Sequence, residues 1–311
     1  MTISVIGLGK MGSRIASKLS GKHQVYVWNR TREASIKFAE QNPKAKILND
    51  LNHLSDLKPP RIVWLMLPAG EPTVEVLYEL KKYLEEGDVI IDGGNAFYKD
   101  TDQRYQEFTN IGIHFLGIGV SGGLFGEKTG YPIMVGGSKE GFILIKPILE
   151  TLSKPNGGYE YFGEGGAGHF VKMVHNGIEY GMMQSIGEGF EVLHKSPFKL
   201  NLSKVAKLWQ KGTIVSGFLM DRTSDALSKN PALNNIVGII EESGEAKWTV
   251  ETAEEQGMEV SNIKQALDYR LESQRSEKIQ SSFTAKLIAA LRREFGGHPV
   301  RQAQGKPVQK K

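Results

Sequence analysis

The chain has 311 residues, of which 40% are hydrophobic and 24% charged, so it is long enough for two domains and too apolar for a disordered protein. Its net charge of +4 does not indicate a nucleic-acid-binding protein and suits an anionic small-molecule substrate equally well. The absence of cysteine excludes disulfides, thiol catalysis and cysteine metal sites.

The start of the chain runs directly into strand-like sequence, without the charged leader and apolar core of a signal peptide. No apolar run reaches membrane-spanning length. We therefore expect a cytoplasmic protein with no membrane partner.

The first motif is a glycine-rich turn between a strand and a helix. The β-branched run Thr2–Ile6 predicts a strand, Gly7-Leu8-Gly9-Lys10-Met11-Gly12 follows it, and residues 13–19 have helical spacing. In this order a GxGxxG turn is typical of a dinucleotide site, because its glycines permit the tight turn, the approach of a pyrophosphate and close packing of helix on strand. We predict that residues 7–12 bind a dinucleotide, the alternative being an ordinary glycine-rich turn.

The second predicted strand, residues 24–28, ends where an NAD-binding unit usually carries an acidic residue for the ribose. Asn29 stands there instead, which removes the carboxylate that would repel a 2′-phosphate. Arg30, Thr31 and Arg32 offer cationic and hydroxyl donors to such a phosphate. We therefore expect NADP as the cofactor, with NAD possible; the alternative is that these arginines are solvated loop charges.

Further strands and helices alternate up to about residue 164. Strand patterns cover residues 61–67, 88–92, 113–117, 131–137 and 159–162, and helical patterns cover 72–85, 100–108 and 139–152. This alternation predicts a Rossmann-type, doubly wound parallel sheet over residues 1–164, with ligands beyond the carboxyl ends of the strands. The residues at those ends are Leu67, Pro68, Asn95, Ser121, Gly122 and Gly123, although the last three could equally form an ordinary turn.

The composition changes after residue 164, and the later segments show helical periodicity. We predict an all-α domain over residues 165–311, with a mobile tail from Pro299. Its first helix carries Lys172, His175, Asn176 and Glu179 at i, i+3, i+4 and i+7, which places them on one stripe. Such a stripe indicates a site, and the alternative is a solvated face with a Lys/Glu pair.

Six stretches of the chain resemble the decarboxylating 6-phosphogluconate dehydrogenases, a branch of the β-hydroxyacid dehydrogenases. They begin at residues 7, 92, 120, 172, 244 and 292. The sequence His175-Asn176-Gly177-Ile178-Glu179-Tyr180 is close to diagnostic for this branch. The other stretches include Asp92-Gly93-Gly94-Asn95, Val120-Ser121-Gly122-Gly123 and Gly244-Glu245-Ala246-Lys247-Trp248. The resemblance runs over nearly the whole chain.

The resemblance implies the site residues and the reaction. Lys172 matches the family's general base and Glu179 its general acid. The family's reaction converts 6-phosphogluconate to ribulose 5-phosphate by oxidation at C3, loss of CO2 and protonation at C1, and it requires no metal. The remaining matches are Asn95, Ser121, Gly122, Gly123, His175 and Asn176 for the carboxylate and hydroxyls, Tyr180, Lys247 and Arg270 for the phosphate, and Arg292 and His298 as a pair that in the family reaches into a neighbouring subunit. The residues around Arg270 depart from the family's usual aromatic pattern.

The chain is shorter than the long family members, whose helical domain is duplicated, and so resembles the short form. Short forms often prefer NAD, which conflicts with the residues at 29–31; we keep NADP. A homodimer or homotetramer is implied. The rival functions are a non-decarboxylating dehydrogenase of a small 3-hydroxy acid and a dinucleotide-binding regulator without turnover.

Overall fold

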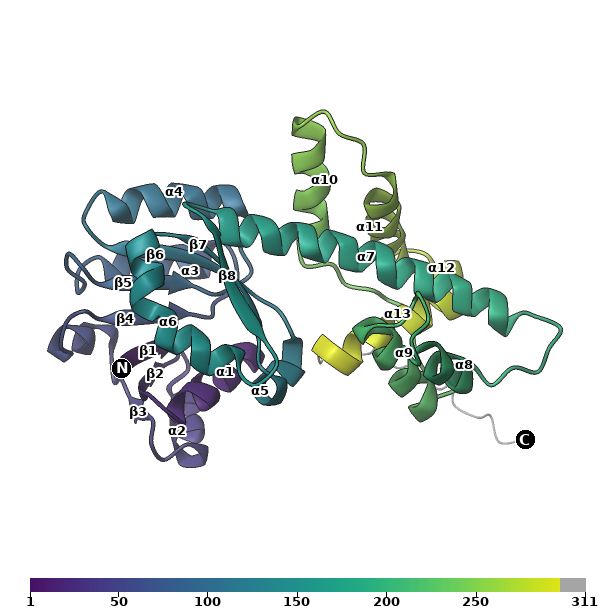
Figure 1. Cartoon of the computed structure of the whole chain (residues 1–311), viewed down its shortest axis with the longest axis horizontal. Coiled ribbons are helices and arrows are strands. Elements are labelled where there is room, and N and C mark those ends of the chain that lie inside the picture. Colours follow the sequence, from purple (N-terminus) through teal and green to yellow (C-terminus); the bar gives the residue numbers. More distant parts are fainter. Residues whose placement is uncertain (297–311) are drawn as a thin grey trace, which may run out of the picture. The chain divides into compact units, whose positions relative to one another are not determined.

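The computed structural model describes residues 1–296, which form two compact units, Met1–Met173 and a second that begins at Val174 (Figure 1). The first is an α/β sheet and the second is helical, so the predicted fold class is confirmed. The predicted tail from Pro299, and His298 before it, lie outside the described residues.

One eight-stranded sheet forms the centre of the first unit, in the order β3-β2-β1-β4-β5-β6-β7-β8. All neighbours pair in parallel except β6 and β7, which are antiparallel. The order reverses between β1 and β4, which is where doubly wound sheets bind their ligands. The strands are β1 Thr2–Ile6, β2 Gln24–Trp28, β3 Lys46–Ile47, β4 Ile62–Leu65, β5 Val89–Asp92, β6 His114–Val120, β7 Pro132–Gly137 and β8 Gly158–Gly163.

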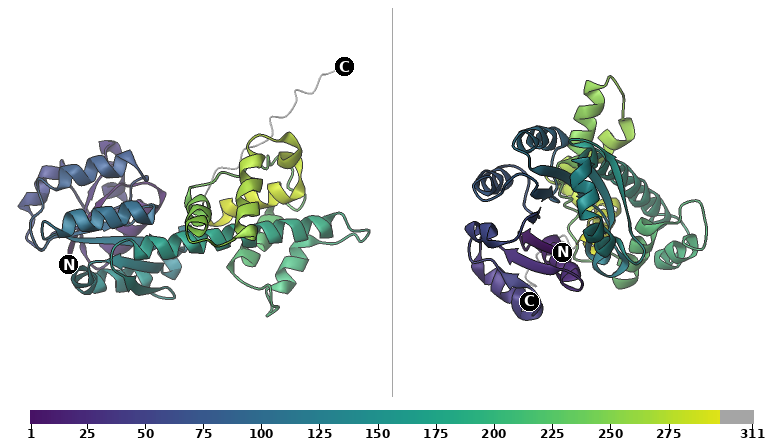
Figure 2. Two further views of the ribbon diagram at one scale, coloured as in Figure 1. Left: turned by 90° about the horizontal axis from the view of Figure 1, so that it is seen from above. Right: turned by 60° about the vertical axis from the view of Figure 1, so that its left-hand side comes forward.

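Helices cover both faces of this sheet (Figures 1 and 2). Alternate residues of each strand point to opposite faces, so Val5 and Trp64 join a core with α1, α2 and α6, while Ile6 and Leu65 join one with α3 and α4. The helices are α1 Lys10–Ser20, α2 Arg32–Gln41, α3 Glu71–Leu80, α4 Tyr98–Thr109, α5 Gly126–Thr129 and α6 Lys139–Ser153, with short 3-10 helices η1 Leu51–Asp56 and η2 Gly123–Phe125.

A long helix, α7 Ala167–His194, begins in the first unit and continues into the second. Its first turn packs closely on the sheet, because a Cβ on Gly168 would overlap the carbonyl of Gly117 and the amide of Gly136. The helices that follow are α8 Leu202–Trp209, α9 Phe218–Lys229, α10 Glu245–Glu255, α11 Ser261–Ser273, α12 Glu277–Ser281 and α13 Phe283–Gly296. None of the helices within residues 1–296 is long and apolar enough to cross a membrane.

The helical unit has its own apolar clusters. Residues of α8, α9 and α13 surround Phe190 of α7 in one of them. Helices α10 and α11 are neighbours (Figure 1). They pack together through Ala246, Val250, Ala266 and Leu267, beside Tyr180 of α7. These contacts fix the start of α10 against the middle of α7, where the predicted substrate residues lie.

Candidate active site

The glycine turn after β1 has the geometry that a dinucleotide needs. Gly7 has φ of 94°, a conformation that favours glycine, and a Cβ on Gly12 would overlap the carbonyl of Gly7. A Cβ on Gly9 would meet no atom within 4 Å, so the backbone at the start of α1 is open to a ligand. The first turn of α1 carries no acidic residue. An anionic diphosphate therefore fits against these helix amides.

Asn29 connects the glycine turn after β1 to the turn between β2 and α2. Its Oδ1 accepts a hydrogen bond from the Leu8 amide at 3.0 Å, and its Nδ2 donates to the Thr31 carbonyl at 3.1 Å. Thr31 precedes α2 without a capping bond from its hydroxyl, and Arg30 is exposed. Arg32 instead donates to Asn49 Oδ1 at 3.2 Å. The end of β2 therefore presents an exposed cation, Arg30, and the hydroxyl of Thr31, whereas Asn29 holds the turn.

A buried ion pair supports the turn that carries Asn95. Asp92, at the end of β5, accepts a hydrogen bond from Arg104 Nη1 at 3.0 Å and another from the Gly94 amide at 3.2 Å. Both charged side chains are buried. Removing one partner of such a pair leaves an uncompensated buried charge, so Arg104 stabilises the turn after β5. The Leu67 carbonyl packs closely on the same turn, because a Cβ on Gly94 would overlap its oxygen.

Lys172 lies against β6 in the first unit. A Cβ on Gly119 would overlap Lys172 Cβ, so the absence of a side chain on β6 is what admits the lysine stem. One turn earlier on α7, His169 Nδ1 shares a hydrogen bond of 2.7 Å with Thr101 Oγ1 of α4. Burial lowers the pKa of His169, so this imidazole is neutral at pH 7. The start of α7 is therefore fixed on two sides.

The helical unit contains a buried arginine, Arg270, with one guanidinium nitrogen that makes no hydrogen bond. Arg270 of α11 is 2% exposed, its Cζ lies 3.2 Å from the centroid of the Tyr180 ring, and its Nη1 has no hydrogen-bond partner. Burial lowers the pKa of Arg270 to about 10; Tyr180 and Glu179 oppose this lowering, and the like charge of Arg292 adds to it. The guanidinium is still charged at pH 7. A charged donor left without a partner is costly, so this pair of arginines suits a bound anion.

A chain of polar contacts joins α7 to the first residue of α10. His175 Nδ1 lies 2.9 Å from Asn176 Oδ1, and Asn176 Nδ2 donates to Glu245 Oε1 at 2.6 Å. Asn176 and Glu245 are both buried, and Glu245 Oε2 has no hydrogen-bond partner. Two predicted substrate residues are therefore hydrogen-bonded, directly or through each other, to a carboxylate for which the sequence predicts no role.

The remaining predicted residues have local contacts. The Lys247 side chain is 61% exposed and its ammonium lies 3.7 Å from Glu251 of the same helix. Ser121 follows β6, and its amide donates to the Pro132 carbonyl. Gly122 and Gly123, which is the first residue of η2, both have positive φ. His298 lies beyond the described residues.

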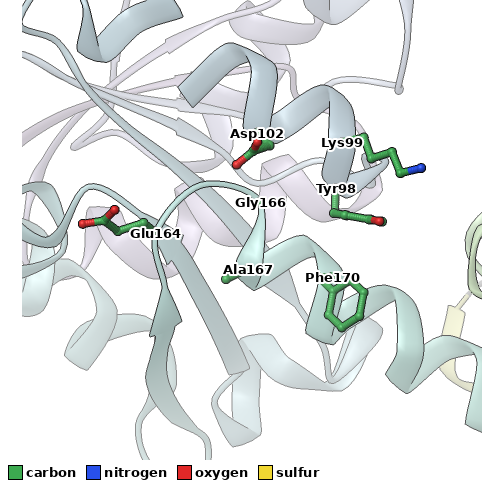
Figure 3. A pocket seen from close by; sticks show the side chains of 7 residues that line it. All are labelled: Tyr98, Lys99, Asp102, Glu164, Gly166, Ala167 and Phe170. Carbon is green, nitrogen blue, oxygen red and sulfur yellow. The ribbon is translucent and has the colours of Figure 1, made fainter. Parts of the chain in front are cut away.

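A hollow of about 460 Å³ opens between the starts of α4 and α7 (Figure 3). Its lining combines two aromatic rings, a cation and two carboxylates, and the rings of Tyr98 and Phe170 meet edge to face at 5.0 Å. None of the predicted site residues lines it. The lining residues are Tyr98, Lys99, Asp102, Glu164, Gly166, Ala167 and Phe170.

Comparison with known proteins gives consistent results. Residues 2–165 match the model for the NAD binding domain of 6-phosphogluconate dehydrogenase, and residues 168–295 match that of the C-terminal domain of the same enzyme. A Bacillus subtilis protein with the provisional name 6-phosphogluconate dehydrogenase is 41% identical over 298 residues, which cover 96% of this chain and 98% of that protein. An NAD(+)-dependent, decarboxylating 6-phosphogluconate dehydrogenase of Haloferax volcanii is 32% identical over 96% of this chain and 98% of its own.

A solved structure extends the comparison. The 6-phosphogluconate dehydrogenase of Plasmodium falciparum, studied with its cofactor NADP+ and its substrate 6-phosphogluconate, superposes with a TM-score of 0.80 at 34% identity. The superposition covers 88% of this chain and 62% of that one. The chain thus has the length of its two full-length relatives and about three fifths of the length of the Plasmodium protein.

Proposed function

The chain belongs to the 6-phosphogluconate dehydrogenase family, and we propose that it oxidises and decarboxylates 6-phosphogluconate to ribulose 5-phosphate and CO2 with NADP. The observation that carries the substrate assignment is Arg270. A guanidinium that is buried, stacked on Tyr180 and still short of a partner at Nη1 suits a phosphate group. A small 3-hydroxy acid without a phosphate would leave that charge uncompensated.

The NADP assignment rests on the residues after β2. The neutral Asn29, the exposed Arg30 and the uncapped start of α2 at Thr31 favour a 2′-phosphate over a bare ribose. The Haloferax relative uses NAD(+), whereas the Plasmodium enzyme uses NADP+, so length alone does not decide the preference.

Lys172 and Glu179 are the proposed base and acid, on one face of α7. A bound nicotinamide supplies the acceptor for the hydride from C3. Lys172, in its neutral form, takes the proton of the C3 hydroxyl and returns it to the carbonyl oxygen as CO2 leaves. Glu179 then protonates C1 of the enediol. Asn95, Ser121, His175 and the other matched residues hold the sugar acid in place.

The substrate assignment predicts strong discrimination between 6-phosphogluconate and gluconate, which differ only in the phosphate. One charge-assisted hydrogen bond corresponds to roughly a ten- to hundredfold effect, so kcat/KM for gluconate should be lower by at least about a hundredfold. In Arg270→Met the kcat/KM values for 6-phosphogluconate and gluconate should approach each other. Unchanged NADP binding by this variant would show that it is folded. Equal kcat/KM for the two acids in the unmodified enzyme would rule out a phosphate site.

The role of Glu179 predicts a loss of turnover without a loss of fold. Glu179→Gln keeps the shape of the side chain but removes the proton donor, so kcat should fall by about a hundredfold or more, with an unchanged KM for NADP. Glu188→Gln makes the same change at an exposed position of α7 and should turn over normally. If the two variants were equally active, Glu179 would only form a structural ion pair.

We also propose that the enzyme works in the cytoplasm as a homodimer or homotetramer. Ile178, Met182 and Val192 are exposed on one face of α7, and a Cβ on Gly181 or Gly189 would meet no atom within 4 Å. This apolar face supports contact with a second copy.

A further inference from the structure

Glu245 is a buried carboxylate at the start of a helix, where acidic side chains are usually exposed to solvent. It is 6% exposed, it begins α10, and its Oε1 accepts the short bond from Asn176 Nδ2. Its own backbone carbonyl accepts a bond from the Thr249 hydroxyl at 2.8 Å, which fixes the first turn. Burying a carboxylate is unfavourable unless its charge is used, and the positive end of α10 compensates only part of that cost.

The chemistry of these groups determines which way each one faces. A carboxylate can only accept hydrogen bonds, so Asn176 must direct its NH2 group toward Glu245. Its carbonyl oxygen then faces His175 Nδ1, and an amide oxygen can only accept. The proton of a neutral His175 must therefore reside on Nδ1, which leaves Nε2 as a hydrogen-bond acceptor.

We propose that Glu245 is a positioning residue that orients the Asn176 amide and thereby fixes His175 as the Nδ1-protonated tautomer, whose Nε2 can accept but not donate a hydrogen bond. The inference rests on the proposed function, because His175 and Asn176 are the proposed ligands of the sugar acid. Glutamine in place of Glu245 would fill the same space but could donate as well as accept. The amide of Asn176 could then turn over, and His175 would lose its single tautomer.

The direct test is the protonation of His175, which requires no turnover. Long-range ¹H–¹⁵N correlation spectra of the full chain, recorded at about pH 8.5 where an ordinary histidine is neutral, distinguish Nδ1–H from Nε2–H imidazole. The signal of His175 is identified by its loss in His175→Gln. We expect Nδ1–H in the unmodified protein and in Glu245→Asp, and an additional Nε2–H population in Glu245→Gln. The same tautomer in all three proteins, or Nε2–H in the unmodified one, would overturn the proposal.

Kinetics supply the second readout. Glu245→Gln should lower kcat/KM for 6-phosphogluconate by about ten- to a hundredfold and leave the KM for NADP unchanged. Glu245→Asp should recover part of that loss. Glu254→Gln makes the same change at an exposed position of α10 and should behave as the unmodified enzyme. Equal losses in Glu245→Gln and Glu254→Gln, or no loss in either, would contradict a positioning role.

The two measurements separate this inference from the proposed function. A tautomer that changes in Glu245→Gln, in a protein that does not oxidise 6-phosphogluconate, would overturn the proposed substrate and keep the role of Glu245 toward His175. Normal oxidation of 6-phosphogluconate with an unchanged tautomer would overturn only the role of Glu245.

Discussion

At the scale of single residues, Asn29 shows how one side chain can serve two purposes. Its oxygen holds the Leu8 amide, which a carboxylate oxygen could do as well. Its NH2 group donates to the Thr31 carbonyl, which a carboxylate could not. The choice of asparagine therefore keeps the turn intact and adds no negative charge next to Arg30.

We therefore expect a change of cofactor preference in Asn29→Asp. The second carboxylate oxygen would face the Thr31 carbonyl and place a negative charge where the 2′-phosphate is expected, so kcat/KM for NADP should fall by about ten- to a hundredfold. The value for NAD should change little. Asn49→Asp adds the same charge beside Arg32 and serves as the control. An unchanged ratio of the NADP and NAD values in Asn29→Asp would refute this placement of the cofactor.

Single residues were also where the sequence was least informative. The glycine turn and the α7 stripe are local patterns, and both could be predicted because their members are close in sequence. Glu245, by contrast, meets Asn176 across 69 positions, and His169 meets Thr101 across 68. No spacing rule connects such pairs, so the supporting residues of the site became apparent only from the fold.

At the scale of elements, β1 and β2 have the predicted bounds, because β-branched and aromatic residues favour strands. Helix α2 and strand β3 were not predicted; β3 has only two residues and α2 buries only Ser35 and Phe38. The helical sequence of residues 261–296 is interrupted twice. Ser276 caps α12, and Ser282 accepts a bond from the Ala285 amide at the start of α13.

The contact between β6 and α7 predicts the effect of Gly119→Ala. The new methyl group would overlap Lys172 Cβ, which is too close to the backbone to move alone, so the start of α7 must shift. Overpacking of this kind costs about 1–3 kcal/mol of unfolding free energy, and displacing the base by about 1 Å can lower kcat by about a hundredfold. Denaturant unfolding and kcat with 6-phosphogluconate measure the two effects.

Gly158→Ala is the matched control, because a Cβ there would meet no atom within 4 Å. It should leave kcat unchanged. If Gly119→Ala and Gly158→Ala had the same kcat, the position of Lys172 against β6 would not affect turnover.

At the scale of the whole molecule, composition and the order of elements were enough to predict a Rossmann-type sheet followed by a helical domain. The reversal of β7 was not predicted, because the residues of an antiparallel strand in a mostly parallel sheet carry the same apolar pattern as their neighbours. Of the two compact units, the first holds the glycine turn and Lys172, and the second holds the Arg270–Tyr180 pair and the His175–Asn176–Glu245 chain.

The decarboxylating function is tested by the ratio of CO2 released to NADPH formed when the purified protein acts on 6-phosphogluconate. We expect one CO2 for each NADPH, with NADP preferred to NAD in parallel reactions. NADPH without CO2 would identify a dehydrogenase that does not decarboxylate. No NADPH at all, from a folded protein that binds NADP, would contradict the account and favour a dinucleotide-binding regulator.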